Sequence, residues 1–319
     1  DQIPLLDKDS AELLGDRKMG SMVDMVSQFE EDELYSQINY QDQPVRVSPL
    51  KYASVIKWFT NMREGIPAYI KIDMATQNTE LVKLSEGMKY TTSDHFNRNI
   101  YRHLRFNYPT YIFNDLSFEI DEDGVPYWIC PVKKYNIGLF GGTTIGRVVL
   151  CNAITGETKD YAVEDVPQWV DRVYSADLLV ELYNYHGTLK HGFFNSVLGQ
   201  KDCLNTTDGY NYLAIDDDVW VYTGVTSITG DQSNVGFVLM NQRTMETKFY
   251  EIEGATESSA MSSAEGQVQN LHYTATFPLL LNISGEPTYF IALKDDAGLV
   301  KKYAMVNVQK PSPPNPSAE

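Results

Sequence analysis

The chain has 319 residues, of which 43% are hydrophobic, so it has room for two or three domains with real cores and needs no disulfide staples. Its formal net charge of -17, from 26 Lys and Arg against 43 Asp and Glu, repels phosphate backbones. No basic stripe is visible, which argues against a nucleic-acid partner. The three cysteines, Cys130, Cys151 and Cys203, are too few and odd in number for a disulfide framework.

The N-terminal part predicts an acidic helical lead-in over residues 1–35, capped near Asp9-Ser10. One or two short strands are expected over residues 35–47. Ser48-Pro49 then resembles a helix start, because serine caps helices and proline suits the first turn. The expected helix places Ile56 and Phe59 on one amphipathic face. Strands are predicted at 69–72 and 79–84.

A second helix is predicted over residues 96–106, capped by Thr92-Ser93-Asp94. It carries a row of arginines, Arg98, Arg102 and Arg105. This row could grip a carboxylate or a phosphate, or pair with the acidic excess of the chain, and we favour internal pairing. Strands follow at 117–121, 146–151 and 159–163, the last two joined by a hairpin turn over 152–157. Cys130 and Cys151 fall in neighbouring strands, where they could pair but are expected to be core thiols.

The C-terminal half predicts a long helical region over 166–198, divided at Gly187 and Gly192. A polar loop is expected at 199–208. Strands are predicted at 210–215, 219–223, 236–241, 247–252, 277–283 and 299–308, with one more helix at 258–271.

A turn pattern recurs as Gly65-x-Pro67-x-Tyr69, Gly124-x-Pro126-x-Trp128 and Gly285-x-Pro287-x-Tyr289. Glycine permits positive φ, proline fixes φ, and the aromatic residue begins a strand. Each turn is expected to follow a helix and open a strand. The sequence therefore predicts an α+β fold of repeated helix-then-antiparallel-strand units, with helices packed on curled antiparallel sheets.

The predicted organisation has four parts. Residues 1–47 form the helical lead-in with short strands, and 48–165 form a first α+β region of two helix-strand units. Residues 166–310 form a second α+β region, and 311–319 form a disordered proline-rich tail. The start at Asp1 and this tail suggest a processed product or a fragment of a longer protein. No stretch of about 18 apolar residues predicts a membrane-spanning helix.

Two stretches resemble the PepSY-like extracytoplasmic domains of bacteria, namely residues 123–130 and Asn152-Ala153-Ile154-Thr155-Gly156-Glu157, with a degenerate echo at Arg243-Thr244-Met245-Glu246. The chain is also similar to uncharacterised bacterial proteins in which such a region follows transmembrane helices. The resemblance implies a PepSY- or cystatin-like fold and an outward-facing, membrane-tethered region that binds, inhibits or scaffolds. Longer hairpins and the segment 138–142 depart from a minimal unit of this kind.

Glycine and acidic clusters are better explained by turns than by ligands. Gly138, Gly141, Gly142 and Gly146 lack the Lys-Ser/Thr and the following helix of a phosphate loop, and Gly146 leads into a predicted strand. The triplet 216–218 could bind a cation with Asp231, but calcium ligands alternate along a loop, so a solvated turn is predicted. Segments 121–124 and 295–298 are expected to be hairpin turns.

Side chains suited to metal binding or nucleophilic attack also lack the required spacing. His95, His103, His186, His191 and His272 form no zinc motif. The serines of 258–263 lack a Ser-x-x-Lys pattern and suit a helix N-terminus. Cys203 lies beside Asp202, which disfavours a thiolate. Asn205 and Asn282 begin formal glycosylation sequons, relevant only in a eukaryotic secretory setting.

The sequence therefore names no catalytic, cofactor-binding or metal-binding residue. We expect a non-enzymatic extracytoplasmic module of a membrane-anchored bacterial protein, which binds a protein or a cell-envelope component. One alternative is a structural or homo-oligomerisation element of a larger membrane assembly. Another is a hydrolase with two facing carboxylates about 5–10 Å apart in a cleft.

Overall fold

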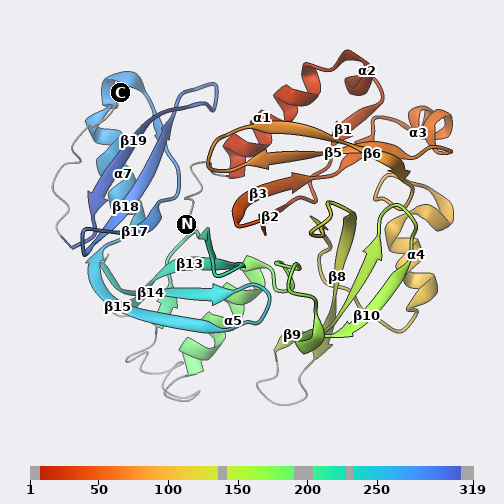
Figure 1. The fold of residues 1–319 in the computed structure, drawn as a ribbon. Helices are drawn as coiled ribbons and strands as arrows, with labels where there is room; N and C mark the ends of the chain where they lie inside the picture. The colour runs from red at the N-terminus through yellow and green to blue at the C-terminus, as the bar shows by residue number, and fades with distance from the viewer. Residues whose placement is uncertain (1–7, 136–141, 190–203, 228–232, 310–319) are drawn as a thin grey trace. The chain divides into compact units, whose positions relative to one another are not determined.

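A computed structural model describes residues 8–135, 142–189, 204–227 and 233–309 of the chain. Helices and antiparallel sheets alternate along it, which confirms the α+β class (Figure 1). The described residues form two compact units. The first contains residues 11–175 and 214–219, and the second contains 8–10, 176–213 and 220–309.

The first unit holds two four-stranded antiparallel sheets, in the orders β2-β3-β5-β6 and β10-β9-β8-β7, and a two-stranded pair of β1 with β4. Its helices are α1 (Lys8–Gly20), α2 (Val23–Val26), α3 (Val55–Asn61), α4 (Ile100–Asn107), η1 (Phe96–Arg98) and η2 (Val163–Asp165). Its strands are β1 (Phe29–Glu31), β2 (Ser36–Tyr40), β3 (Gln43–Ser48), β4 (Leu50–Tyr52), β5 (Ile66–Asp73), β6 (Thr79–Met88), β7 (Ser117–Ile120), β8 (Pro126–Tyr135), β9 (Thr143–Asn152) and β10 (Thr158–Ala162).

Aromatic side chains join the two larger sheets of this unit. The ring of Tyr69 on β5 lies 6.0 Å from that of Phe118 on β7, which lies 5.3 Å from the ring of Trp128 on β8. All three side chains are buried. Edge-to-face packing at these distances adds to the free energy gained by burying the rings. The Tyr69 hydroxyl also donates to the carbonyl of Gly124 at 2.9 Å, so the turn before β8 is fastened to β5.

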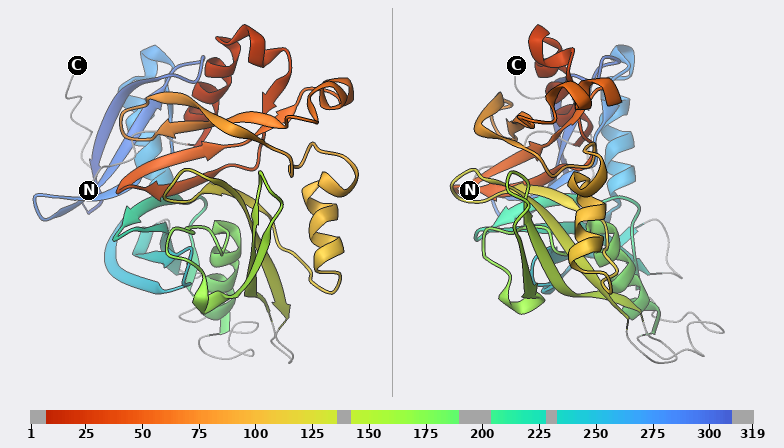
Figure 2. Two further views of the ribbon diagram at one scale, coloured as in Figure 1. Left: turned by 45° about the vertical axis from the view of Figure 1, so that its right-hand side comes forward. Right: turned by 90° about the vertical axis from the view of Figure 1, so that its right-hand side faces the viewer.

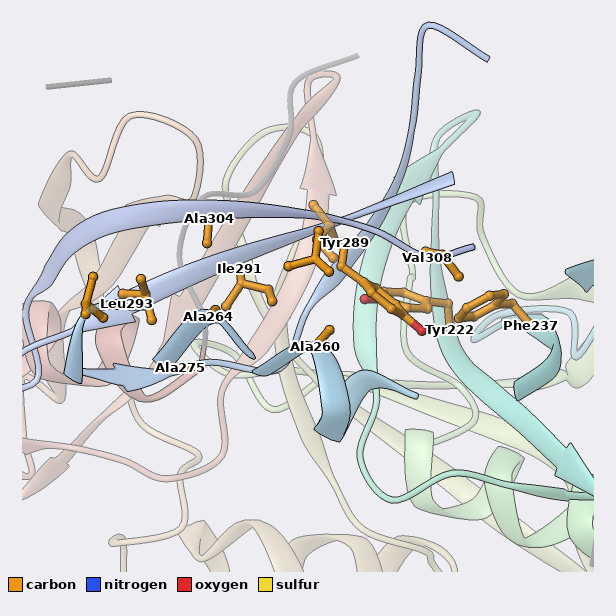
Figure 3. Close-up of a cluster of buried hydrophobic side chains, with 13 residues drawn as sticks. Tyr222, Phe237, Ala260, Ala264, Ala275, Tyr289, Ile291, Leu293, Ala304 and Val308 are labelled. Carbon is orange, nitrogen blue, oxygen red and sulfur yellow. The ribbon is translucent and has the colours of Figure 1, made fainter. Parts of the chain in front are cut away.

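The second unit contains α5 (Ala176–Leu189) and α7 (Glu257–Gln267), and its sheets have the orders β11-β13-β14-β15, with β12 beside β13, and β16-β18-β17, with β19 beside β18. Alanines on α7 let the helix approach the sheet closely, and Ala260 and Ala264 are fully buried against Tyr222, Phe237 and Tyr289 (Figure 3). The remaining elements are β11 (Leu204–Thr206), β12 (Asn211–Ile215), β13 (Asp218–Ser227), β14 (Ser233–Asn241), β15 (Thr247–Ala255), η3 (Gln269–Leu271), β16 (Thr274–Ala275), β17 (Leu279–Ile283), β18 (Glu286–Lys294) and β19 (Val300–Asn307).

Each of four sheets contains one strand pair with the same local arrangement. In each, an Asp or Asn at the end of one strand lies opposite a residue near the start of its neighbour. The four pairs are Val45 with Asp73, Tyr127 with Asn152, Trp220 with Asn241, and Thr288 with Asn307. In every case the side-chain oxygen of the Asp or Asn accepts from the backbone N–H two residues later, at 2.8–2.9 Å.

In each pair, the strand that faces the Asp or Asn is preceded by a residue with left-handed backbone conformation, always at the same distance along the chain. Asp42, Gly124, Asp217 and Gly285 have φ values of 61°, 78°, 66° and 85°. Each stands three residues before the strand residue of its pair, which is Val45, Tyr127, Trp220 or Thr288. In three of the four turns, the residue just before that strand residue is a proline, namely Pro44, Pro126 or Pro287. Proline suits this place because its missing N–H is not needed at a strand start. The carbonyls of these prolines accept from Met74, Ala153 and Val308.

The predicted turn is present at Gly65, Gly124 and Gly285, which all have positive φ and precede strands, but Gly65 differs from the other two in its place in the sheet. Gly65 has a φ of 83°, yet it follows α3 and opens β5, which is the opposite strand of its pair. The true counterpart in that sheet is Asp42-Gln43-Pro44, which has no glycine. The spacing from helix to turn varies, as expected, because β7 lies between α4 and Gly124, and β16 and β17 lie between α7 and Gly285.

Three helix starts differ from the predictions. Ser48 lies inside β3, and the buried Leu50 and Tyr52 alternate with Lys51 as a strand, so the cap of α3 is Ser54, whose hydroxyl accepts from Lys57 N. The cap of α4 is Asn99, not Thr92–Asp94. Asp9 and Ser10 lie within α1.

The predicted long helix over 166–198 is wrong in its first ten residues, and residues 190–198 lie outside the described part of the chain. Its described helical portion, α5, begins at Ala176. The N–H groups of Asp171 and Arg172 donate to the carboxylate of Glu119 on β7 instead of to helix carbonyls. This tertiary contact holds the chain in an irregular conformation where local propensity favours a helix.

The remaining predicted strands and the helix at 258–271 are present, with ends shifted by a few residues. The expected polar loop at 199–208 contains β11 in its described part. No described helix is long and apolar enough to span a bilayer. The division of the chain into four segments at 47, 165 and 310 stays a prediction.

Replacing Asn152 tests the turn design. Its Oδ1 accepts from Ile154 N at 2.9 Å and from Thr155 N at 3.1 Å, so Asn152→Ala is expected to lower the free energy of unfolding by about 1–2 kcal/mol. Asn152→Asp keeps the acceptor oxygen, and Asp73 fills the same position naturally, so it should leave stability within about 0.5 kcal/mol of wild type. Urea unfolding followed by circular dichroism measures both. Equal losses for the two variants would contradict the role given to this side chain.

Candidate functional site

The acidic clusters at 121–124 and 295–298 lie in turns, as expected, and so do Asp216 and Asp217, whereas Asp218 begins β13. Residues 138–141 and Asp231 lie outside the described part, and Gly146 lies within β9. Asp216 and Asp217, with φ of 48° and 66°, form the two-residue link between β12 and β13, a hairpin geometry that requires positive φ at both positions. Among the described residues no three His, Cys, Asp or Glu side chains are grouped to hold a metal.

The described histidines and thiols have structural surroundings. His103 Nε2 lies 2.7 Å from the carbonyl of Gly156, and its ring packs on Tyr90. Cys130 and Cys151 are free and buried, which confirms the expectation of core thiols. Burial raises the pKa of the Cys151 thiol to about 12, so it is not a thiolate at neutral pH. His191 and Cys203 lie outside the described residues.

The serine cluster at 258–263 belongs to α7, in agreement with the helix-terminus interpretation. The capping side chain, however, is Thr256, whose Oγ1 accepts from Ser259 N at 3.2 Å. The following residue, Glu257, is 1% exposed although its side chain is ionisable. Its Oε1 accepts from Gly224 N at 2.7 Å and its Oε2 from Asn234 Nδ2 at 3.2 Å. A Cβ on Gly224 would lie 2.5 Å from Glu257 Oε1, so only glycine admits this contact.

Glu119 is the corresponding buried carboxylate of the first unit. It is fully buried and accepts from Asp171 N at 3.0 Å and Arg172 N at 2.8 Å. Burial raises the pKa of its carboxyl from 4.5 to about 7, and the two backbone N–H groups oppose that shift. Sequence alone gave no sign of Glu119 or Glu257. Both use their oxygens to bind backbone or amide N–H groups in the interior, which is a structural role.

Four large apolar side chains on α3 and η1 stand in solvent. Val55, Ile56, Phe59 and Phe96 are 64%, 74%, 72% and 68% exposed, and together they are called the apolar tip. The sequence placed Ile56 and Phe59 on a buried helix face, which is wrong, because Trp58 is the side of α3 that packs inward. Exposed apolar side chains gathered in one place indicate an interaction site.

The apolar tip rests on a rigid support. The Trp58 ring lies 6.5 Å from Phe59 and 6.1 Å from Phe96. Its Nε1 donates to Asp94 Oδ1 at 3.1 Å, and Asp94 Oδ2 accepts from Thr91 Oγ1 at 2.7 Å. Asp94 is 2% exposed, and burial raises the pKa of its carboxyl from 3.8 to about 6.

Phe96 is held in a strained backbone conformation. Its φ is 57°, in the left-handed region that bulky residues rarely adopt. The strain costs free energy and the ring gains little burial in return. Such strain concentrates at functional positions, where the surrounding structure holds a side chain in place for a partner.

Basic residues are frequent in the two chain segments that carry the apolar tip. Residues 51–63 and 95–114 contain no Asp or Glu. Their basic residues, here called the basic collar, are Lys51, Lys57, Arg63, Arg98, Arg102 and Arg105. Arg98 Nη1 donates to the carbonyl of Met62 at 2.8 Å, which ties η1 to the end of α3.

No ion pair joins Arg98, Arg102 or Arg105 to a carboxylate within the described part of the chain. Against the larger effect of burial, the charge of Arg98 does lower the pKa of the Asp94 carboxyl, so the expected internal pairing is seen in this weaker form for Arg98. On α4 the buried positions are Ile100 and Leu104, so Arg102 and Arg105 fall on the opposite, exposed face. The sequence shows no basic stripe, because the residues of the collar come from two segments that are separate in the chain. Their lack of acidic residues in a chain of net charge -17 was the available signal.

Comparison with known proteins assigns no family. No protein-family model matches the chain, and no curated protein matches it. Among solved structures it is similar to a chain of the crystal structure of a D477G ACO/RPE65 chimera, at 8% sequence identity and a TM-score of 0.18. The alignment covers 85% of this chain and 46% of that one, so the chain spans less than half the length of that protein. A TM-score this low supports no argument about fold or function.

Replacing Asp94 tests the support of the apolar tip. The pKa of its carboxyl is higher in the folded protein than its ordinary 3.8, so ionisation opposes folding, and stability falls as pH rises from about 4 to about 6. Asp94→Asn cannot ionise but keeps an oxygen for Trp58 Nε1. Between these two pH values it should lose less unfolding free energy than wild type does, by on the order of 2 kcal/mol.

Urea unfolding at both pH values measures this difference. The exposed Asp115 is the matched control, and Asp115→Asn should retain the wild-type pH dependence. If Asp94→Asn and wild type lost equal stability over this interval, the buried carboxyl would not be the group responsible.

Proposed function

We propose that the chain is a non-enzymatic module that binds a protein or a cell-envelope component. The observation that carries the proposal is the apolar tip, four large apolar side chains exposed around a fixed tryptophan. Leaving these side chains in water costs free energy that a partner surface would recover. The buried carboxylates Glu119 and Glu257 add no competing chemistry, because their oxygens bind N–H groups of the protein itself.

We further propose that the chain is built from PepSY-like repeats and lies outside the cytoplasm, tethered to a bacterial membrane in the full-length protein. The shared register of four strand pairs, each with a left-handed turn at the same offset, supports the repeat. The turn of the resemblance, Asn152–Glu157, has close counterparts at residues 73–78 and 241–246. In all three, the fifth residue is left-handed and the fourth is threonine. Location and tether rest on the resemblance alone.

A structural or oligomerisation role is the second candidate, favoured by β15. This nine-residue strand pairs with β14, and no other described strand pairs with it. Phe249 and Tyr250 on it are 45% and 46% exposed. A long edge strand with free backbone groups and exposed aromatic rings can add a strand from another copy. The hydrolase alternative has no such supporting feature, since it needs two carboxylates facing each other across a cleft.

Binding through the apolar tip is tested by affinity capture from bacterial cell-envelope extract. Ile56→Ser/Phe59→Ser removes two side chains that are mostly exposed to solvent, so the fold should persist. At least one component identified by mass spectrometry should be retained by wild type and reduced about tenfold by this variant. Ile283→Ser/Met305→Ser removes two exposed apolar side chains of the second unit and should capture as wild type does. Identical captures by all three proteins would argue against the tip as the binding site.

Sedimentation velocity tests self-association through β15. If the strand pairs between copies, the wild-type chain at high concentration should sediment as a dimer or larger species. Phe249→Ser/Tyr250→Ser should then shift the population towards monomer by about tenfold in dissociation constant. A wild-type chain that remains monomeric at all concentrations would remove this candidate.

A further inference from the structure

The chemistry of the apolar tip and the basic collar restricts the partner further than binding alone. The exposed side chains of the tip are one valine, one isoleucine and two phenylalanines, and none carries a hydrogen-bonding group. Protein interfaces favour Tyr, Trp, Phe, Met and Arg and are depleted in Lys, and valine is under-represented among the residues that contribute most to their affinity. A partner that offers an apolar interior without hydrogen-bonding requirements fits these four side chains best.

The arrangement around α3 resembles what an interfacial anchor needs. Val55, Ile56 and Phe59 fall within one arc of the helix, at positions i, i+1 and i+4. Lys57 and Arg63 flank them along the same chain segment, and Arg98 is fixed beside them by its bond to Met62. Apolar side chains ringed by Lys and Arg bind at the boundary between acyl chains and headgroups.

α4 extends the same chemistry. It lies on the same side of the first unit as α3 in the views of Figures 1 and 2. Its exposed face carries Arg102 and Arg105 between Tyr101 and Phe106, which are 50% and 75% exposed. Tyrosine and arginine are both suited to the headgroup level of a bilayer.

Charge decides between an anionic and a neutral surface. The two segments of the collar hold six basic residues and no acidic one, while the whole chain has a net charge of -17. An anionic surface therefore repels most of the molecule and attracts this part. That asymmetry orients the chain, because only a collar-first approach is favourable.

We propose that the apolar tip inserts into the surface of an anionic phospholipid bilayer while the basic collar contacts the headgroup phosphates. This proposal rests on the proposed binding function and names its partner. The two signals act together, since apolar insertion or basic attraction alone gives weak, reversible membrane binding. Asp94 holds Trp58 beneath the tip, so Ile56, Phe59 and Phe96 are presented without prior rearrangement.

Vesicle co-sedimentation with the complete 319-residue chain tests the proposal. The probes are vesicles of phosphatidylcholine alone and of phosphatidylcholine mixed with phosphatidylglycerol. Wild type should sediment with the mixed vesicles at low salt, weaken as sodium chloride is raised, and bind the neutral vesicles at least about tenfold less.

Two pairs of variants separate the two signals. Ile56→Ser/Phe59→Ser should lower binding to mixed vesicles about tenfold or more, while Ile283→Ser/Met305→Ser should bind as wild type does. Arg102→Glu/Arg105→Glu should lower binding by more than about tenfold, because each change reverses a charge. Lys83→Glu/Lys302→Glu makes the same charge change at two exposed lysines outside the collar and should have a smaller effect. Circular dichroism of each variant confirms that it is folded.

The outcomes distinguish the two proposals. No binding to mixed vesicles, or equal binding by tip and control variants, overturns the membrane proposal. If the tip variant nevertheless loses an identified protein in the envelope capture, the binding function stands and its partner is a protein. If the tip variant loses neither vesicles nor any captured component, both proposals fail.

Discussion

The left-handed turn residue and the Asp or Asn opposite it are the constraint on which the sheets depend. A strand shifted by one residue turns every side chain to the other face, so each sheet needs its register fixed locally. Here the turn sets where one strand begins, and the oxygen of Asp73, Asn152, Asn241 or Asn307 sets where its neighbour ends. Buried residues such as Trp128 and Tyr289, two residues beyond the prolines, then point inward and build the cores.

Buried carboxylates connect these sheets to neighbouring segments whose position local sequence pattern does not determine. Glu119 takes the N–H groups of Asp171 and Arg172 and keeps that segment from becoming helical. Glu257 fastens the start of α7 to β13 and β14 through Gly224 and Asn234. An ionisable group is costly to bury unless it is hydrogen-bonded, and in both cases the protein supplies N–H donors to the carboxylate. The same principle holds Asp94 under Trp58, with the difference that this support lies directly beneath the exposed surface.

The surface of the first unit is where the structure departs from what stability alone requires. Ile56, Phe59 and Phe96 gain little from folding in these positions, and Phe96 also carries backbone strain. Arg102 and Arg105 share their side of the unit without an ion pair among the described residues. Sites of this kind reduce stability in exchange for contact with a partner, which is why the binding function is placed here and not at the buried carboxylates.

Much of the fold was readable from the sequence, because strands, hairpin turns and the helix of 257–267 follow from alternation, glycine and capping residues that act locally. The turns at Gly124 and Gly285 were recognised by glycine and the turn at 216–218 by its acidic triplet between strands, whereas the equivalent turn at Asp42 was not, since a single aspartate in the left-handed region leaves no comparable signal. Tertiary structure alone decided that Ser48 continues a strand, that residues 166–175 are not helical, and that Ile56 and Phe59 face solvent. Each of these depends on contacts between residues far apart in the chain, such as Glu119 with Asp171 and Trp58 with Asp94. Local propensity carries no information about such long-range contacts. The same holds for the basic and apolar surface, because residues 51–63 and 95–114 come together only in the folded chain.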